Sequence, residues 1–238
     1  YLRSIHLMAE GHRERLRIRF QSENIDTIPE YIVLEYFLQG VIYRRDTNPI
    51  ARELISRFGS LAAVVDAPLR ELKKVDGIGE SAAVFIKMLP KLYRKYCISK
   101  WDAPVIFNST PDVGRFFCQR LIGYENEVIA AVCMDGNCKY LAYECLTEGG
   151  CDSVDFNPRT VIEFALKYNA SRLVIAHNHP NSACLYSYDD VNSTYALQEA
   201  LTLVGIYLDD HIIVSGDEFI SLRTEGIFDK HPPEERKA

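Results

Sequence analysis

The sequence predicts an α/β domain over residues 105–228, preceded by a small all-α domain over residues 1–100. Strand-like and helix-like segments alternate after residue 105, which is typical of α/β folds. Before residue 100, apolar residues recur at helical spacing. The charge changes at the same place: residues 1–100 have 17 Lys and Arg against 12 Asp and Glu, a net of +5, whereas residues 101–238 have 10 against 21, a net of −11. Such an asymmetry favours two domains with different partners.

The first domain is predicted from apolar residues spaced three to four positions apart, as on one face of an α-helix. The segments with this pattern are residues 32–38, 50–58 and 68–72, and a helix that begins near Glu80. Gly59 follows the second segment, and glycine commonly ends a helix. The helical pattern stops over residues 97–104, where Pro104 appears. This stretch is therefore predicted to be a linker.

The second domain is predicted from apolar runs that follow one another as strands and helices. In chain order we expect a helix at 111–121, strands at 127–134 and 139–146, a helix at 158–169, a strand at 173–179, a helix at 189–204, and strands at 207–215 and 219–222. The turn Asp135-Gly136-Asn137 favours a hairpin between the first two strands. This order of elements predicts an α/β domain.

The densest group of chemically active side chains is formed by His177, His179, Ser187 and Asp190, which lie within fourteen positions. The two histidines follow a short apolar run, and on a strand residues two apart point to the same side. Pro180 cannot donate to a sheet ladder and should end the strand. Ser187 is a favourable helix N-cap, which places Asp190 in the first helical turn. The end of a strand and the start of a helix are therefore expected to meet.

Two imidazoles and one carboxylate are a donor set of catalytic zinc sites, in which water takes the fourth position. Water bound to zinc has a pKa near ~7, so hydroxide is available at neutral pH. We therefore predict one Zn²⁺ ion held by His177, His179 and Asp190. Ser187 is the candidate donor to the oxyanion that forms during hydrolysis. The competing interpretation is an incidental cluster of polar side chains.

These four residues form the pattern H-x-H-x7-S-x2-D, which resembles the signature of JAB/MPN (JAMM) metalloprotease domains, and the chain as a whole is similar to the RadC family. The similarity includes further segments of the sequence, at residues 11–17, 75–79, 157–159, 169–180 and 210–214. It implies a JAMM α/β fold related to that of cytidine deaminases, behind a helix-hairpin-helix-like domain. It also implies a link to DNA repair. The loop 181–186 departs from the family, since it has no proline and contains Cys184.

The resemblance also implies a general base, because JAMM enzymes use a glutamate upstream of the H-x-H, at the start of a strand. Glu127 fits this role, since alternating apolar residues follow it and Asp135 lies eight positions on. Glu125 is a close competitor. In the other interpretation, both carboxylates only solvate the start of a strand. His211, on the predicted strand 207–215, is expected to be structural or to support a ligand.

The segment 75–79 lies between two predicted helices and resembles the hairpin of a helix-hairpin-helix motif. Glycines let the backbone approach a ligand, and a helix N-terminus offers N–H groups to a phosphate. Hairpins of this kind bind phosphates and not base edges. The candidate contacts to nucleic acid are Lys73, Lys74, Gly77 and Gly79. The alternative is a packing or protein-docking hairpin, since Asp76 and Glu80 would repel phosphate.

Two functions follow from these patterns. The first is a zinc metalloprotease-type hydrolase that acts on an amide or isopeptide bond of a protein or peptide. The second is a non-catalytic, DNA-repair-linked module that binds DNA through its N-terminal hairpin. The first is favoured, because a structural zinc site would have four protein ligands and no open position. Nucleobase deamination is disfavoured, because the chain has no P-C-x-x-C motif.

The composition indicates in which part of the cell the protein is expected. The seven cysteines are odd in number and form no C-x-x-C motif, which predicts reduced thiols in a cytoplasmic protein. No run of about 18 apolar residues is present, so we expect no membrane span. The polar tail 229–238 contains two prolines and is predicted to be disordered. The sequence does not predict an oligomeric state.

Overall fold

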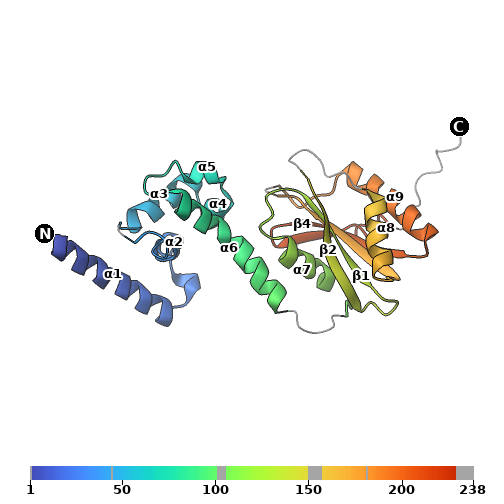
Figure 1. The fold of residues 1–238 in the computed structure, drawn as a ribbon, viewed down its shortest axis with the longest axis horizontal. Helices are drawn as coiled ribbons and strands as arrows, with labels where there is room; N and C mark the ends of the chain where they lie inside the picture. The colour runs from blue at the N-terminus through green and yellow to red at the C-terminus, as the bar shows by residue number, and fades with distance from the viewer. Residues whose placement is uncertain (1, 44, 101–105, 150–156, 181, 229–238) are drawn as a thin grey trace. The chain divides into compact units, whose positions relative to one another are not determined.

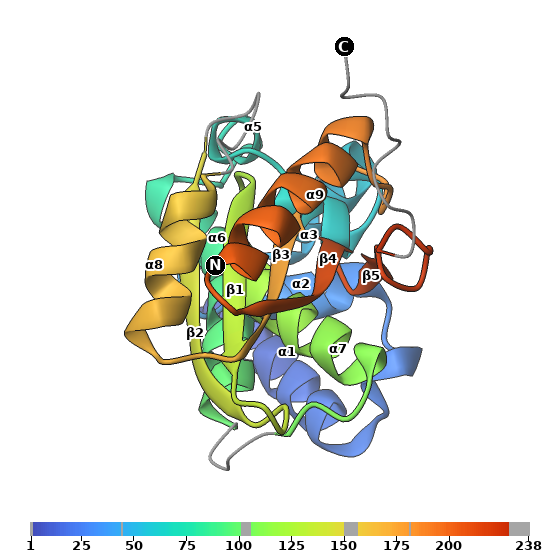
Figure 2. The same cartoon turned by 90° about the vertical axis from the view of Figure 1, so that its right-hand side faces the viewer.

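The computed structural model, drawn in Figures 1 and 2, describes residues 2–43, 45–100, 106–149, 157–180 and 182–228. The predicted disordered tail at 229–238 and residues 101–104 of the predicted linker lie outside these residues. Residues 97–99 of that linker are helical, because the helix Glu80–Ser99 continues through them. The chain divides into two compact units, Tyr1–Leu92 and Tyr93–Ala238, called unit 1 and unit 2 below. Among the described helices, none combines the length and the apolar content that a membrane crossing requires.

In the described part of unit 1 every regular element is a helix, as the sequence predicts. Its helices are α1 (Leu2–Ser22), the short η1 (Ile25–Thr27), α2 (Glu30–Leu38), α3 (Asn48–Phe58), α4 (Leu61–Asp66), α5 (Leu69–Leu72) and the first part of α6 (Glu80–Ser99). Helix α3 ends where predicted, because Gly59 adopts a φ of +98° that other residues rarely take. The core of unit 1 contains the fully buried side chains Leu34, Leu38, Leu54, Leu72 and Ile86.

Unit 2 is an α/β domain built on one five-stranded sheet. Its elements after α6 are α7 (Thr110–Leu121), β1 (Val128–Met134), β2 (Tyr140–Glu148), α8 (Pro158–Lys167), β3 (Arg172–Asn178), α9 (Tyr188–Leu203), β4 (Tyr207–Ser215) and β5 (Glu218–Ser221). The strand order is β2-β1-β3-β4-β5. Strands β3 and β4 are parallel, and the other neighbouring pairs are antiparallel. The sheet is therefore mixed.

Helices cover both faces of this sheet, with α7 on one face and α8 and α9 on the other (Figure 2). Successive residues of a strand point to opposite faces. In β3, Val174 and Ala176 pack on the α7 side, whereas Leu173 and Ile175 pack on the side of α8 and α9. His177 continues the second series and so lies on the α8–α9 face.

The observed elements differ from the predicted ones mainly at their ends. Strand β4 has the bounds predicted for it. Helix α8 ends two residues early, because Asn169 adopts a left-handed φ of +51°. Strand β3 ends one residue before His179, whose backbone N–H still donates to the Val214 carbonyl at 2.8 Å. Because of this bond, His179 keeps its place beside the sheet.

Candidate metal centre

The predicted metal ligands come from two elements that meet at one end of the sheet. His177 is the penultimate residue of β3, and His179 follows the last residue of that strand. Asp190 lies in the first turn of α9, and Ser187 is the N-cap of this helix. The strand end and the N-cap that the spacing predicted are therefore confirmed.

The donor atoms of these three residues converge. Nε2 of His177 lies 2.9 Å from Nε2 of His179 and 3.2 Å from Oδ1 of Asp190. One ligand atom from each residue lies within 4.8 Å of the other two. Two imidazole nitrogens and a carboxylate oxygen at this spacing fit a Zn²⁺ ion, which takes such donors at about 2.0–2.2 Å. His177 is buried, whereas His179 and Asp190 are only part-buried, so the cluster lies at the edge of the core.

A capping box orients the carboxylate of Asp190. The backbone N–H and the hydroxyl of Ser187 both donate to Oδ2 of Asp190, at 2.6 and 2.7 Å. In return, Oγ of Ser187 accepts from the Asp190 N–H at 3.1 Å. Oδ2 is thus held by Ser187, and Oδ1 is the oxygen beside His177. Ser187, the predicted oxyanion donor, thus donates its hydroxyl to the carboxylate of Asp190 in this structure.

Burial sets the charge state of His177. Removal from water lowers the pKa of this imidazole to about 4; Asp190 acts in the opposite direction, and His179 adds to the lowering. At neutral pH the His177 ring is therefore uncharged. The uncharged ring is the form that can donate a lone pair to a metal ion.

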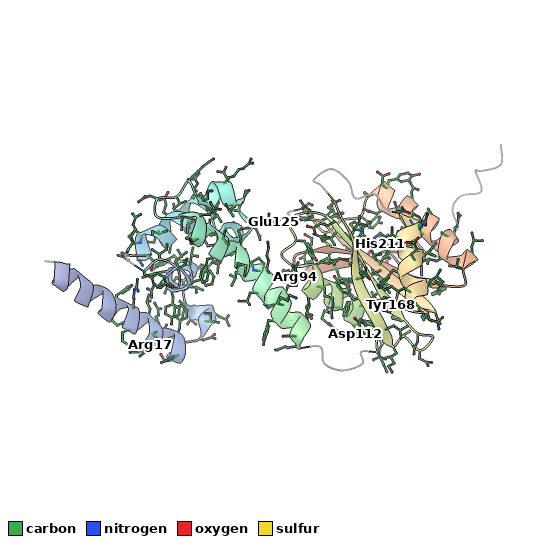
Figure 3. The ribbon with its side chains drawn as sticks, viewed as in Figure 1. Arg17, Arg94, Asp112, Glu125, Tyr168 and His211 are labelled. Carbon is green, nitrogen blue, oxygen red and sulfur yellow. The ribbon has the colours of Figure 1, made fainter. Side chains whose placement is uncertain are left out.

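A further histidine, His211 on β4, is labelled in Figure 3 and forms a hydrogen bond with His177. Its Nε2 is 2.8 Å from Nδ1 of His177, and its Nδ1 is 2.6 Å from Oγ1 of Thr194. His211 is only 2% exposed and Thr194 1%. Burial, together with His177 and His179, lowers the pKa of His211 well below its ordinary value. The sequence reasoning did not identify Thr194, although it lies four residues after Asp190 on one face of α9.

The segment before β1, which contains Glu127, is fixed by Asn178 at the end of β3. The Asn178 side chain accepts from the backbone N–H of Val128 at 2.8 Å and donates to the carbonyl of Asn126 at 3.1 Å. The two bonds are made by the residues immediately before and after Glu127. The residue between the two histidines of the H-x-H pattern thus holds the backbone around the predicted base.

The strand register places Ile129, two residues after Glu127, on the same face of the sheet as His177. Ile129 of β1 is directly opposite His177 of β3 in the antiparallel pair, so their side chains share a face. Glu127 lies just before β1, and its backbone carbonyl accepts from the N–H of Gly149 at 3.0 Å. Glu125, the competing base, is exposed in the preceding loop.

Comparisons with known proteins determine the family. The model of the RadC-like JAB domain matches residues 107–227. The chain belongs to the RadC-like JAB domain family. It is also similar to UPF0758 proteins of Fusobacterium nucleatum (31% identical, over 92% of this chain and 97% of the relative) and Ruegeria pomeroyi (32%, over 90% and 96%). Another such protein, from Xanthomonas oryzae pv. oryzae, is 30% identical over 90% of this chain and 95% of the relative. The predicted resemblance to the RadC family is confirmed. The predicted α/β fold, which follows a helical region in the sequence, is confirmed as well.

The candidate nucleic-acid contacts of this RadC-like protein lie in unit 1, around the hairpin between α5 and α6. Both lysines form ion pairs with glutamates: Lys73 with Glu80 at 2.5 Å, and Lys74 with Glu71 at 2.7 Å. Their charge is therefore partly neutralised within the protein. The first of these pairs also engages Glu80, one of the two carboxylates expected to repel phosphate.

The two hairpin glycines differ in their surroundings. Gly77 has a φ of +90°, and a Cβ added there would lie 2.5 Å from Cδ1 of Ile50. Gly79 has no atom within 4 Å of the corresponding position. The fold therefore requires a glycine at position 77, whereas a side chain at position 79 would extend into open space.

Proposed function

We propose that this RadC-like protein is a zinc-dependent hydrolase of the JAMM type, which cleaves an amide or isopeptide bond in a protein or peptide. The observation that supports this proposal is the convergence of His177, His179 and Asp190 at a part-exposed position. Three such donors leave a coordination position for water, as in catalytic zinc sites.

The ion would be held by Nε2 of His177, a ring nitrogen of His179 and Oδ1 of Asp190. Bound zinc would lower the pKa of a water molecule to about 7 and polarise the carbonyl of the substrate. His177 presents a neutral ring for this purpose, because burial lowers its pKa to about 4. Ser187 keeps the second oxygen of Asp190 occupied, so that Oδ1 remains directed at the ligand cluster.

Glu127 acts as the general base in this proposal. Its carboxylate accepts the proton of the attacking water as the water oxygen bonds to the carbonyl carbon. It returns that proton to the nitrogen of the leaving amine as the C–N bond breaks. General acid–base catalysis of this kind contributes about 10²- to 10⁴-fold to the rate.

Ser187 donates to the oxyanion that develops on the carbonyl oxygen. In the structure its hydroxyl donates to Oδ2 of Asp190. The hydroxyl rotates to the substrate, and the Ser187 backbone N–H, at 2.6 Å, continues to hold Oδ2. Ser187 therefore orients Asp190 through its backbone N–H and stabilises the oxyanion through its hydroxyl.

The first experiment is elemental analysis of the purified chain beside His177→Ala, His179→Ala and Asp190→Ala. We expect close to one zinc per chain in the parent protein and a loss of zinc in all three variants. A parent protein that stays folded but takes up no added zinc would reject the hydrolase.

Peptide and isopeptide substrates are then screened with Glu127→Gln and its matched control Glu125→Gln. We expect Glu127→Gln to keep zinc and lose about 10²- to 10⁴-fold in rate. Glu125→Gln should keep both zinc and activity. A loss of activity in Glu125→Gln alone would assign the base to Glu125.

A further inference from the structure

A buried chain of hydrogen bonds connects two of the proposed ligands. It passes from Nδ1 of His177 to Nε2 of His211 over 2.8 Å, and from Nδ1 of His211 to Oγ1 of Thr194 over 2.6 Å. It ends at the backbone carbonyl of Asp190, 2.6 Å from Oγ1 of Thr194. The chain thus starts at one ligand on β3 and returns to another on α9. Neither His211 nor Thr194 has a role in the chemistry proposed above.

The backbone carbonyl of Asp190, at the end of this chain, determines which atom is the donor in each hydrogen bond. A carbonyl oxygen only accepts, so the hydroxyl of Thr194 donates to Asp190. The Thr194 oxygen then accepts from Nδ1 of His211, which must have the ring proton. Nε2 of a neutral His211 is left with a lone pair and accepts from Nδ1 of His177.

This direction leaves the lone pair of His177 on Nε2. Nε2 is the atom that lies 2.9 Å from His179 and 3.2 Å from Asp190. The reverse direction would place the proton of His177 on Nε2 and block that atom as a ligand. Because His211 and Thr194 are at most 2% exposed, bulk water is not available to replace either partner.

We propose that His211 and Thr194 are positioning residues, which hold His177 in the single neutral tautomer able to bind a metal ion and couple its ring to the helix that presents Asp190. This inference rests on the proposed metal function of the centre. Loss of the hydrogen-bond partner of a metal-binding histidine typically lowers metal affinity or activity about 10- to 100-fold. The two residues belong to different elements, so the coupling also fixes β4 and α9 relative to the ligand strand.

The test on the full chain uses two substitutions of Thr194. Thr194→Val keeps the branched shape but removes the hydroxyl, whereas Thr194→Ser keeps the hydroxyl. Zinc affinity is measured by competition with a chromophoric chelator. We expect Thr194→Val to bind zinc about 10- to 100-fold more weakly than the parent protein, and Thr194→Ser to retain the parent affinity. Equal affinities in the two variants would overturn the proposal.

A second measurement is made on the parent protein. In metal-free parent protein labelled with ¹⁵N-histidine, long-range ¹H–¹⁵N spectra at neutral pH report which ring nitrogen has the proton. We expect the Nδ1–H form for both His177 and His211, with signals assigned from His177→Gln and His211→Gln. An Nε2–H form at His177 would overturn the proposal. If the parent protein binds no zinc, the proposed function fails, while the tautomers still test the hydrogen-bonded chain.

Discussion

The burial that keeps His177 neutral also makes the metal-free protein sensitive to acid. The unfolded imidazole has a pKa near 6.5, and the folded one has a pKa of about 4. Between these values the unfolded chain binds more protons, so the free energy of unfolding falls as the pH decreases. Above pH ~6.5 the ring is neutral in both states and contributes no pH dependence.

We therefore expect the metal-free parent protein to lose stability relative to His177→Gln as the pH falls from about 6.5 to about 4. Denaturant unfolding of both proteins in the presence of a chelator measures this difference. The comparison removes the contribution of groups that titrate equally in both proteins. A difference that stays constant across this range would contradict the neutral, buried state assigned to His177.

Ser187 combines a capping role with a proposed catalytic one, and Ser187→Ala separates them. The loss of the cap should cost about 1 kcal/mol of stability. Zinc affinity should change little, because the backbone N–H of residue 187 still holds Oδ2 of Asp190. The catalytic rate should fall by about 10²- to 10³-fold, as for other oxyanion donors. If zinc binding is lost as well, the hydroxyl mainly orients the ligand.

At the scale of elements, we expect substitution of the two glycines in the hairpin between α5 and α6 to have different effects on stability. Gly77→Ala should lower the free energy of unfolding by about 1–3 kcal/mol, because alanine is strained at a φ of +90°. Gly79→Ala should cost less, since nothing lies near the added methyl group. Denaturant unfolding of the full chain checks both values.

Gly79→Ala also tests the predicted DNA interface, because it alters the surface of the hairpin at little cost to the fold. With both nearby lysines already paired, we expect its affinity for a labelled duplex in low salt to equal that of the parent protein. Fluorescence anisotropy makes the comparison, and Lys73→Gln serves as the matched charge variant. A clear loss of affinity in both variants would instead show that the hairpin contacts phosphates.

The elements around the site were predictable where the signal is local. Ser187 marks the start of α9, and a short apolar run followed by Pro180 marks the end of β3, because caps and strand breakers act within a few residues. The contact between His177 and His211 was not predictable. It depends on the parallel register of β3 and β4, which shifts between Leu173 and Val174. A register shift of this kind has no local sequence signal.

The same reasoning applies to the lysines of the hairpin. Their number and position are evident from the sequence, and so is the Lys74–Glu71 pair, whose residues are three positions apart. The partner of Lys73 depends on how the chain folds back on itself. Lys73 and Glu80 are seven residues apart and meet because the hairpin turns between them. A count of basic residues does not show such ion pairs.

At the scale of the whole molecule, the proposed ligands, Glu127 and the His211–Thr194 pair all lie within unit 2. Unit 1 has a separate apolar core. A ligand that binds only the folded state stabilises it by about 2.7 kcal/mol at a concentration 100 times its dissociation constant. Zinc should therefore stabilise unit 2 directly, and unit 1 only if the two units unfold together.

We expect zinc to slow amide hydrogen exchange in β3, β4 and the first turns of α9, and to leave exchange in α2 to α5 unchanged. Mass spectrometry of the full chain with and without zinc measures both regions in one experiment. Asp190→Ala is the control, because it removes one proposed ligand and should abolish the response. Equal slowing in unit 1 would show that the two units open as one cooperative body, since a site confined to unit 2 can protect unit 1 only through shared unfolding.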